Sequence, residues 1–574
     1  MTRSRIPGRL AGALVLAACT RAPAPGGVVP ARLPETHAPQ PTAAAISAAD
    51  LMTRLYIFAD DSMLGRETGT VGHLKSTQYI ADELARLGLQ PAGDRGGWFQ
   101  DVPMYRRAFD PASTIRAGDV VLHGGTDFIA GGRGTITRPT AGEVIFGGVQ
   151  GDTTVTLTPD QVRGKVVVFA APAAPIGFAL LRSPAFRRLQ QALGTAAATV
   201  VVAPEGLTPG MVRTATSPAP GNVAMRSEAG ETPSPVTITT TAQGAEAILG
   251  APLAGARVGQ AGRAIQLDLR FREEPAPARN VVAILPGSDP VLRHQYVAIG
   301  AHNDHVGYNP ARAVDHDSLH LYNQARFAIS GLVPRGTPLT PAQQQAIAGI
   351  RVNLDSMRAL RPVRRDSIFN GADDDGSGSV TTLELAEAFA LAPEKPKRSI
   401  LFVFHTGEEK GLLGSEWYTD HPTVPRDSIV AQLNMDMVGR GEAQDIPGGG
   451  PQYLQLVGSR RLSTQLGDLV ESVNAKQPLP FRFDYTFDAN GHPENIYCRS
   501  DHYSYARYGI PVTFFTTGLH GDYHQVTDEP QYIAYAHMAR VGQLVHDVAM
   551  AVANDPQRPV VDKPKPDPRG ACRQ

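Results

Sequence analysis

The sequence lacks an excess of charge of either sign and also lacks long apolar runs. Its 574 residues include 54 Lys and Arg against 55 Asp and Glu, which gives a formal net charge of −1. No basic stripe stands out, so nucleic acid is not expected as a partner. No apolar run approaches the roughly 20 residues of a membrane-spanning helix. Hydrophobic residues make up 42% and charged residues 19%, which places the chain among globular proteins.

Cysteine is scarce, with 3 residues in the chain. Cys498 and Cys572 are the two that follow Cys19. They lie far apart in the sequence, and Cys572 belongs to a Pro-rich tail, so we do not predict a disulfide between them. An oxidising compartment would permit one, and the sequence leaves the pairing open.

The N-terminus has the features of an export signal. Three arginines and no acidic residue precede a short apolar stretch that ends in Leu-Ala-Ala-Cys19. This ending resembles a bacterial lipobox, which implies a signal peptide over 1–18, cleavage before Cys19 and a lipid on its thiol. Residues 19–44 are rich in Pro, Ala and Gly and are expected to form a flexible tether. Because Thr20 is not an inner-membrane retention residue, we expect attachment to the outer membrane or elsewhere in the cell envelope.

The remaining chain divides by its patterns. Residues 45–110 have helical periodicity, whereas 111–274 hold short β-type runs among Gly, Pro and Thr, with one or two helices. In 275–555 apolar strand patterns alternate with helical ones, which predicts an α/β fold: a three-layer sandwich with a central, mostly parallel mixed sheet. The Pro- and charge-rich end, 556–574, is expected to be disordered.

Acidic and histidine residues follow several of the predicted strands. The run Ser399–Ser415 reads SILFVFHTGEEKGLLGS and puts Glu408 and Glu409 just past an apolar strand. Ligands of open α/β sheets bind outside the carboxyl ends of the strands, so groups at these ends should meet. The other candidates in equivalent places are His302, Asp304, the run 373–375, Asp436 and His524. Nitrogen and oxygen ligands without Cys suit zinc, cobalt or manganese, and their number fits two ions that share a carboxylate.

The ordered motifs GAHxD, GADDDGSG, GEEKGLLGS, NMDMVGR, SDHYSYARYGIP and DYHQVTDEP resemble the co-catalytic di-zinc aminopeptidase family. That family includes bacterial leucyl aminopeptidases, aminopeptidase Y and glutamate carboxypeptidase. The resemblance covers about 48–110 and 275–551. The β-rich part, 111–274, resembles the protease-associated domain that is often inserted in this family.

The resemblance implies a role for individual residues. Two zinc ions would be bound, one by His302 and Asp436 and the other by Glu409 and His524, with Asp374 as the bridge. Glu408 would be the general base, Tyr523 would stabilise the oxyanion, and Asp304 would orient His302 through a hydrogen bond. The neighbours of Asp374 are expected to shape the turn.

The other histidines near these motifs are not expected to act. We prefer His302 to His305 as the ligand because His302 lies nearest the strand end and forms the His-x-Asp pattern. His405 is expected to be a packed or capping residue, and His502 is given no catalytic role. Asp501 is a candidate for lining the pocket.

The predicted activity is zinc-dependent removal of N-terminal residues from peptides. Two alternatives on the same fold are a carboxypeptidase that acts on acidic dipeptides and a glutaminyl cyclase, and a third is a non-catalytic receptor-like protein. The segment 308–368 departs from the family, because a short loop is usual between the first ligand and the bridging Asp. Its ends lie beside the predicted site, so we expect a lid or a wall there, and its arginines would favour acidic or carboxylate-ended substrates.

Overall fold

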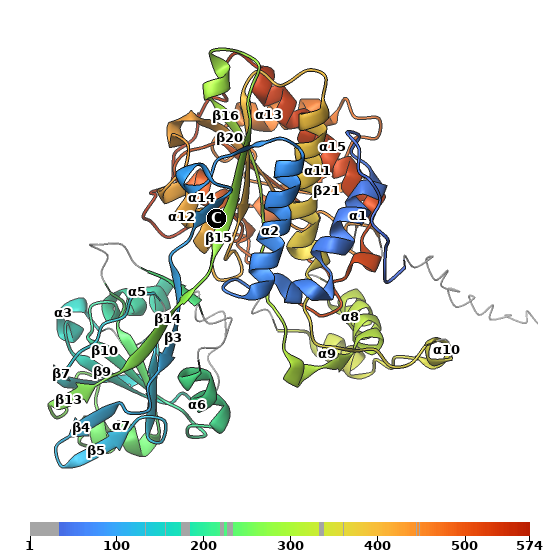
Figure 1. The fold of residues 1–574 in the computed structure, drawn as a ribbon. Helices are drawn as coiled ribbons and strands as arrows, with labels where there is room; N and C mark the ends of the chain where they lie inside the picture. Colours follow the sequence, from blue (N-terminus) through green and yellow to red (C-terminus); the bar gives the residue numbers. More distant parts are fainter. Residues whose placement is uncertain are drawn as a thin grey trace, which may run out of the picture.

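The computed structural model describes residues 34–132, 134–154, 157–173, 184–217, 223–226, 233–331, 338–359, 361–443, 445–446 and 448–574. The chain forms two bodies joined by a pair of long strands (Figure 1). The larger body contains the predicted metal residues, and the smaller one is built from residues between about 110 and 271. The lipidation residue Cys19 and the predicted signal peptide lie outside the described residues.

A mixed sheet forms the middle of the larger body. Its strand order is β1-β15-β19-β16-β20-β23-β21-β22, and β2 also pairs with β15. The four central strands, β19, β16, β20 and β23, run parallel, whereas β15 and β21 pair antiparallel with β19 and β23. The bounds are β1 (Gln90–Pro91), β2 (Phe99–Asp101), β15 (Arg279–Leu285), β16 (Tyr296–His302), β19 (Ser399–His405), β20 (Ile429–Met435), β21 (Tyr453–Val457), β22 (Arg482–Asp484) and β23 (Val512–Thr516).

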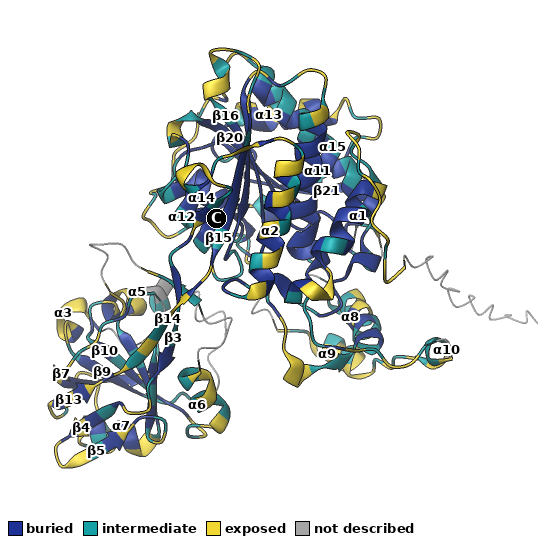
Figure 2. Cartoon of the chain, viewed as in Figure 1, coloured by how far each residue is buried: buried dark blue, intermediate teal, exposed yellow. Residues whose placement is uncertain are grey.

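Helices cover both faces of this sheet, because its strands are apolar on both sides. In β19, Phe402 and Phe404 belong to one apolar cluster, while Leu401 and Val403 belong to another on the opposite face. The first face packs against α1 (Ala48–Phe58), α2 (Val71–Arg86), α11 (Gly378–Leu391), α13 (Thr464–Asn474) and α15 (Tyr535–Asn554). The second packs against α12 (Leu413–Asp420) and α14 (His502–Ala506). The predicted α/β fold with a mixed sheet is confirmed, and Figure 2 shows the buried strands between their helices.

The smaller body has its own apolar core, made from two sheets and several helices. One sheet has the order β6-β12-β10-β9-β8, the other β5-β4-β13-β7. Its strands are β4 (Thr114–Ala117), β5 (Val120–His123), β6 (Phe128–Gly131), β7 (Ala141–Gly142), β8 (Val144–Val149), β9 (Val166–Ala170), β10 (Ala198–Val202), β12 (Val236–Thr240) and β13 (Ile265–Asp268). Among its described residues, the helices are α3 (Pro159–Val162), α5 (Pro184–Leu193), α6 (Pro209–Thr216) and α7 (Ala242–Leu249). Its resemblance to a protease-associated domain stays a prediction.

Two antiparallel strands join the bodies. They are β3 (Met104–Phe109) and β14 (Phe271–Ala276), with β11 (Val223–Met225) on the other side of β3. The chain therefore enters and leaves the smaller body side by side, as an insertion between two parts of the larger body requires (Figure 1).

The segment 308–368 forms a helical excursion at one end of the larger body (Figure 1). It contains β17 (Val314–Asp315), α8 (His316–Ser330), α9 (Pro341–Ala348), α10 (Asp355–Arg358) and β18 (Arg365–Asp366). Its two ends meet where Tyr308 forms a bridge with Ile368. Within the described residues, no helix of the chain is both long and apolar enough to cross a membrane.

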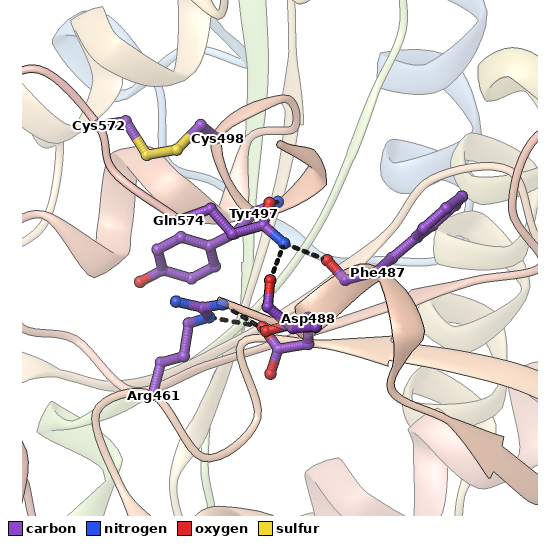
Figure 3. Close-up of a disulfide and its surroundings, with 8 residues drawn as sticks. Arg461, Phe487, Asp488, Tyr497, Cys498, Cys572 and Gln574 are labelled. Carbon is purple, nitrogen blue, oxygen red and sulfur yellow. Dashed lines mark hydrogen bonds and ion pairs between the residues drawn. A yellow bond between two sulfur atoms is a disulfide. The ribbon is translucent and has the colours of Figure 1, made fainter. Parts of the chain in front are cut away.

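The C-terminal tail corrects the sequence analysis. Residues 556–574 were expected to be disordered, but they lie against the larger body. Cys572 forms a disulfide with Cys498, and the Gln574 side-chain amide donates to the backbone oxygens of Phe487 and Ala489 (Figure 3). The composition indicated disorder because it offers little apolar surface, but a covalent bond and hydrogen bonds to exposed backbone hold the tail instead.

The C-terminal part of the predicted tether is also packed against the larger body. The described residues 34–44 lie along α1, where the Gln40 backbone N–H donates to the Thr53 hydroxyl and the Ala43 N–H donates to Asp50. A composition rich in Pro and Ala predicted a flexible segment, but short polar side chains on α1 satisfy its backbone.

A buried arginine joins α1 to α11. The Arg54 guanidinium contacts Glu83 at 2.6 Å and Glu384 at 3.1 Å, and it also pairs with Glu387. Burial raises the pKa of Glu384 to about 7 even though Arg54 lies beside it. Because the folded-state pKa lies above that of the unfolded chain, the contribution of Glu384 to stability is full in acid and is lost as the pH rises through 7.

We therefore expect Glu384→Gln to become increasingly stabilising, relative to the wild type, between pH 5 and pH 8. A pKa raised from 4.5 to about 7 corresponds to about 3 kcal/mol at the alkaline end. Urea unfolding of both proteins at several pH values measures the difference. A difference that does not change with pH would contradict this assignment.

We expect Cys572→Ser to lower the free energy of unfolding by about 2–4 kcal/mol. The disulfide closes a loop with a sequence separation of 74, so its loss frees a long stretch of the unfolded chain. Denaturant unfolding with and without a reductant checks it: reductant should destabilise the wild type and leave the variant unchanged. Equal stability of the wild type and the variant without reductant would show that the disulfide does not stabilise the protein.

Candidate metal centre

The predicted ligands come together at the carboxyl edge of the central sheet. His302 is the last residue of β16, Asp436 follows β20, and the Glu pair follows β19 after a turn at Gly407. Asp374 lies in the turn 372–377 that opens α11, and His524 lies in the loop after β23. Parallel strands bring all of these loops to one edge.

The first cluster contains His302, Asp374 and Asp436. The His302 Nε2 lies 3.2 Å from Asp374 Oδ1 and 3.6 Å from Asp436 Oδ1. All three residues are buried. One imidazole nitrogen and two carboxylate oxygens thus face a common point, and three protein ligands are the set of a catalytic zinc site.

The second cluster shares Asp374 and uses its other carboxylate oxygen. Asp374 Oδ2 lies 3.0 Å from His524 Nε2, which is also 3.0 Å from Glu409 Oε1. His305 completes this cluster, with its Nδ1 2.9 Å from the same Glu409 oxygen. The two oxygens of one carboxylate thus face two different ligand sets, which is the arrangement of a bridging ligand.

The polar atoms of both clusters are arranged to bind metal ions rather than to form hydrogen bonds with one another. Several are buried and have no hydrogen-bond partner: His302 Nε2, His305 Nδ1, Asp374 Oδ2, Glu409 Oε1 and His524 Nε2. Buried polar groups are normally hydrogen-bonded, and leaving five such atoms unpaired would cost several kcal/mol. A cation between them removes this cost, and zinc suits nitrogen and carboxylate ligands.

Glu408 lies beside the first cluster and belongs to neither. Its Oε2 is 3.9 Å from His302 Nε2, and the residue lines the adjacent cavity. Burial raises the pKa of Glu408 well above its usual range, with His302 opposing the shift and Glu409 adding to it. A carboxyl group with a raised pKa takes up a proton more readily than an ordinary carboxylate.

Asp304 is close to His302, and its side chain holds the surrounding loops. The His302 Nδ1 lies 3.0 Å from the backbone oxygen of Asp304 and 3.6 Å from its carboxylate. The carboxylate accepts hydrogen bonds from the Thr68 hydroxyl and the Glu408 backbone N–H. The ring of His302 is therefore oriented mainly by a backbone carbonyl, and the carboxylate mainly positions the Glu408 turn.

Tyr523 lies at the cavity beside the second cluster. Its ring stacks on His524 with 4.0 Å between centroids, and its hydroxyl accepts a hydrogen bond from Arg499 at 3.3 Å. Burial, followed by the charge of Asp374, raises the pKa of Tyr523 well above its ordinary value. The hydroxyl therefore stays protonated and can donate. The sequence analysis missed Arg499, which no metal motif marks.

The neighbours of Asp374 shape its turn, as predicted. Asp375 accepts from the backbone N–H groups of His302, Gly378 and Met437. Asp373 accepts from the Gly439 N–H at 2.6 Å. Both side chains thus join the Asp374 turn to the ends of neighbouring strands.

The histidines that were set aside differ in their positions. His405 lies 3.0 Å from the Tyr505 hydroxyl, and burial lowers its pKa to about 3. His502 stacks on Phe514, and burial lowers its pKa to about 3 as well. Both are neutral packing residues. Asp501 is fully buried and does not line the cavity. His305, by contrast, faces the second cluster, while His302 faces the first.

A buried charge network holds the loop that carries His524. The Asp528 carboxylate accepts from the backbone N–H groups of Asp373 and Asp374 and lies 3.8 Å from Arg440, which also contacts Asp522 at 3.3 Å. From helix α8 of the 308–368 segment, His320 reaches the same Asp522 at 3.1 Å. The insertion therefore packs against the ligand loop. None of its described residues lines the cavity beside the metal residues, and the lid stays a prediction.

That cavity lies beside the first cluster and touches the second only through the shared Asp374. Asp374, Glu408 and Asp436 form its metal end. Its apolar wall is formed by Met437, Phe487, Ile496, Phe514 and Leu519. The arrangement places an apolar wall next to the carboxylates of the first cluster.

Comparison with known proteins gives a family for part of the chain. Residues 350–549 match the model of Peptidase family M28. Leucine aminopeptidase 1 of Aspergillus fumigatus is 28% identical over 197 residues, which is 32% of this chain and 47% of that protein. A probable leucine aminopeptidase of Trichophyton verrucosum is 32% identical over 112 residues, 19% of this chain and 30% of that protein. The chain thus spans less than half the length of these curated relatives.

Two solved structures are similar at lower identity. The aminopeptidase from Aneurinibacillus sp. strain AM-1 is 16% identical, with a TM-score of 0.45, and the match covers 91% of this chain and 97% of that one. A zinc aminopeptidase from Bacillus subtilis is 16% identical, with a TM-score of 0.46, covering 91% and 99%. These likenesses are too distant to support an argument about the site. The segment that matches the model of Peptidase family M28 carries Asp374, the Glu pair, Asp436 and His524.

Proposed function

We propose that this chain is a zinc-dependent exopeptidase that removes N-terminal residues from peptides. The observation that carries the proposal is the pair of ligand clusters on opposite oxygens of Asp374, with Glu408 beside them and outside both. His302, Asp374 and Asp436 would hold one ion, and Asp374, Glu409 and His524 the other. Two zinc ions, when bound, supply Lewis acidity toward the peptide carbonyl and toward the attacking water.

Side chains of the protein then transfer the proton and stabilise the developing negative charge. Glu408 takes a proton from the attacking water on its carboxylate and passes it to the leaving amine. The protonated hydroxyl of Tyr523 donates a hydrogen bond to the carbonyl oxygen as that oxygen gains negative charge. Arg499 holds this hydroxyl in place and has its own charge balanced by Glu494 at 2.9 Å.

The cavity supports a preference for an apolar N-terminal side chain. Its wall away from the clusters is apolar, and burying one such side chain contributes about 1.5–3 kcal/mol. Two matched relatives carry the name leucine aminopeptidase, which is consistent with this preference.

The alternative of a carboxypeptidase for acidic dipeptides loses part of its support, because three arginines of the insertion are already paired. It rested on the arginines of the 308–368 segment. Arg358 pairs with Asp315 and Asp317, Arg361 with Asp317, and Arg364 with Glu529. These guanidinium groups are committed within the protein. A glutaminyl cyclase would need one zinc, and a receptor without catalysis would not need an intact ligand set.

Assays with purified protein test the activity directly. We expect about two zinc ions per chain and hydrolysis of leucyl- and phenylalanyl-nitroanilides, with N-acetylated versions of the same substrates left intact. Cleavage of the acetylated substrates at equal rates would contradict an exopeptidase that acts from the N-terminus.

Glu408→Gln and Glu409→Gln are expected to separate chemistry from metal binding. Because Glu408 faces the cavity without joining a cluster, its variant should keep both zinc ions while kcat falls by about 10²–10⁴. Glu409→Gln should instead lose zinc. Zinc content measured beside kcat decides between them, and the reverse pattern would exchange the two roles.

We also propose that the mature protein is anchored in the cell envelope through a lipid on Cys19, as its lipobox-like N-terminus supports. A disulfide between Cys498 and Cys572 is consistent with an oxidising compartment. Mass spectrometry of the mature N-terminus should find an acylated Cys19. Any other N-terminal residue there would exclude the anchor.

A further inference from the structure

His305 is a buried histidine that the proposed mechanism leaves without a task. It follows the ligand His302 by three residues, and its side chain is fully buried. Neither of its ring nitrogens has a hydrogen-bond partner. A buried imidazole with both nitrogens unpaired is costly, so a stabilising partner is required.

The surroundings of His305 aim its ring at the second cluster. Nδ1 lies 2.9 Å from Glu409 Oε1 and 3.8 Å from Asp374 Oδ2. Its ring meets that of His524 edge to face at 5.5 Å between centroids. On the other side is Gly371, where a Cβ would lie 2.5 Å from Cδ2 of His305. A glycine at this position, with φ +53°, leaves the space that the imidazole occupies.

Four ligand atoms therefore surround one point. One atom each from His305, Asp374, Glu409 and His524 lies within 4.8 Å of all the others. Zinc with ligands at about 2.0–2.2 Å in a tetrahedron needs ligand atoms about 3.3–3.6 Å apart. Four separations between ligand atoms in this cluster, 2.9, 3.0, 3.0 and 3.8 Å, lie on both sides of that range.

A hydrogen bond to Glu409 does not explain this geometry. Although His305 Nδ1 lies 2.9 Å from Glu409 Oε1, neither atom forms a hydrogen bond of normal geometry. Two atoms that approach each other without such alignment are typical of neighbouring ligands that point to a third atom between them.

We propose that His305 is a fourth protein ligand of the metal ion held by Asp374, Glu409 and His524. This inference rests on the proposed function, because it assumes that the cluster binds zinc. The second cluster then has two imidazole nitrogens and two carboxylate oxygens, a closed tetrahedral set. The first cluster, with His302, Asp374 and Asp436, has three protein ligands and one open position.

The two metal positions are therefore unequal. Closed four-ligand sets are typical of structural zinc, whereas three ligands and an open position are typical of catalytic zinc. Glu408 lies on the side of the open cluster, 3.9 Å from His302 Nε2. Glu408 thus lies next to the position at which the attacking water would bind.

Zinc binding by the full chain tests the proposal with a readout other than activity. His305→Ala and His305→Phe are compared with the wild type by dialysis against zinc buffers and metal analysis. Loss of an orienting neighbour typically weakens metal binding 10–100-fold, so loss of a ligand should weaken one of the two zinc ions at least about 100-fold and leave the other unchanged.

Double variants locate the lost ion. His305→Ala combined with Glu409→Gln should still hold one zinc ion, because both changes affect the same position. His305→Ala combined with Asp436→Asn should hold neither ion firmly. His537→Gln is the matched control: His537 is also buried, but its Nε2 lies 2.8 Å from the backbone oxygen of Tyr453, away from the clusters. It should bind zinc like the wild type.

X-ray absorption distinguishes a ligand from a residue that only supports one. In the wild type with two zinc ions bound, we expect three imidazole nitrogens to ligate the two ions. If His305 is not a ligand, only two imidazole nitrogens should be found. A wild type with two zinc ions and only two imidazoles, or His305 variants with unchanged affinity, would overturn this inference and leave the proposed function standing. A wild type that binds no zinc would overturn both.

Discussion

The carboxylate of Asp374 is the constraint on which the rest of the site depends. It must present one oxygen to His302 and Asp436 and the other to Glu409 and His524, so its position has to be fixed in every direction. The backbone around it is held accordingly. Asp528 accepts the Asp374 N–H, and the buried Arg66 donates to the backbone oxygens of Asn370 and Gly371. Buried charged side chains thus fix the backbone geometry around Asp374.

The same demand explains why so many charged groups are buried at the edge of the sheet. A metal-ligating loop after a strand has no regular hydrogen-bonding partner, and its backbone groups need side-chain acceptors. Asp375 and Asp528 supply them, and Arg440 lies 3.8 Å from the Asp528 carboxylate. The insertion joins this system through His320 and Asp522. The insertion thus helps to hold the His524 loop in place.

The sequence predicted those parts of the site that local patterns determine. Apolar runs with polar residues at their carboxyl ends indicated both the strands and the edge of the sheet where Asp436 and the Glu pair lie. The central sheet and its alternation with helices followed from the same periodicity. The order of the strands did not, because it depends on packing among distant segments.

The features that could not be predicted from the sequence depend on contacts between residues far apart in the chain. His305 looked like an alternative to His302, and only the space left by Gly371, 66 positions away in the sequence, brings both rings to separate clusters. Cys498 and Cys572 are separated by 74 positions, and nothing in the tail composition indicates that they meet. Arg499 carries no motif, and its approach to Tyr523 depends on the fold of the loops around it.

The central claim is that Asp374 bridges two metal ions, and anomalous diffraction at the zinc edge from crystals of the zinc-loaded protein tests it most directly. The account predicts two peaks about 3.5–4 Å apart, one on each oxygen of Asp374. The first should lie among His302 and Asp436, and the second among Glu409, His524 and His305. A single peak, or peaks that do not both contact Asp374, would contradict it.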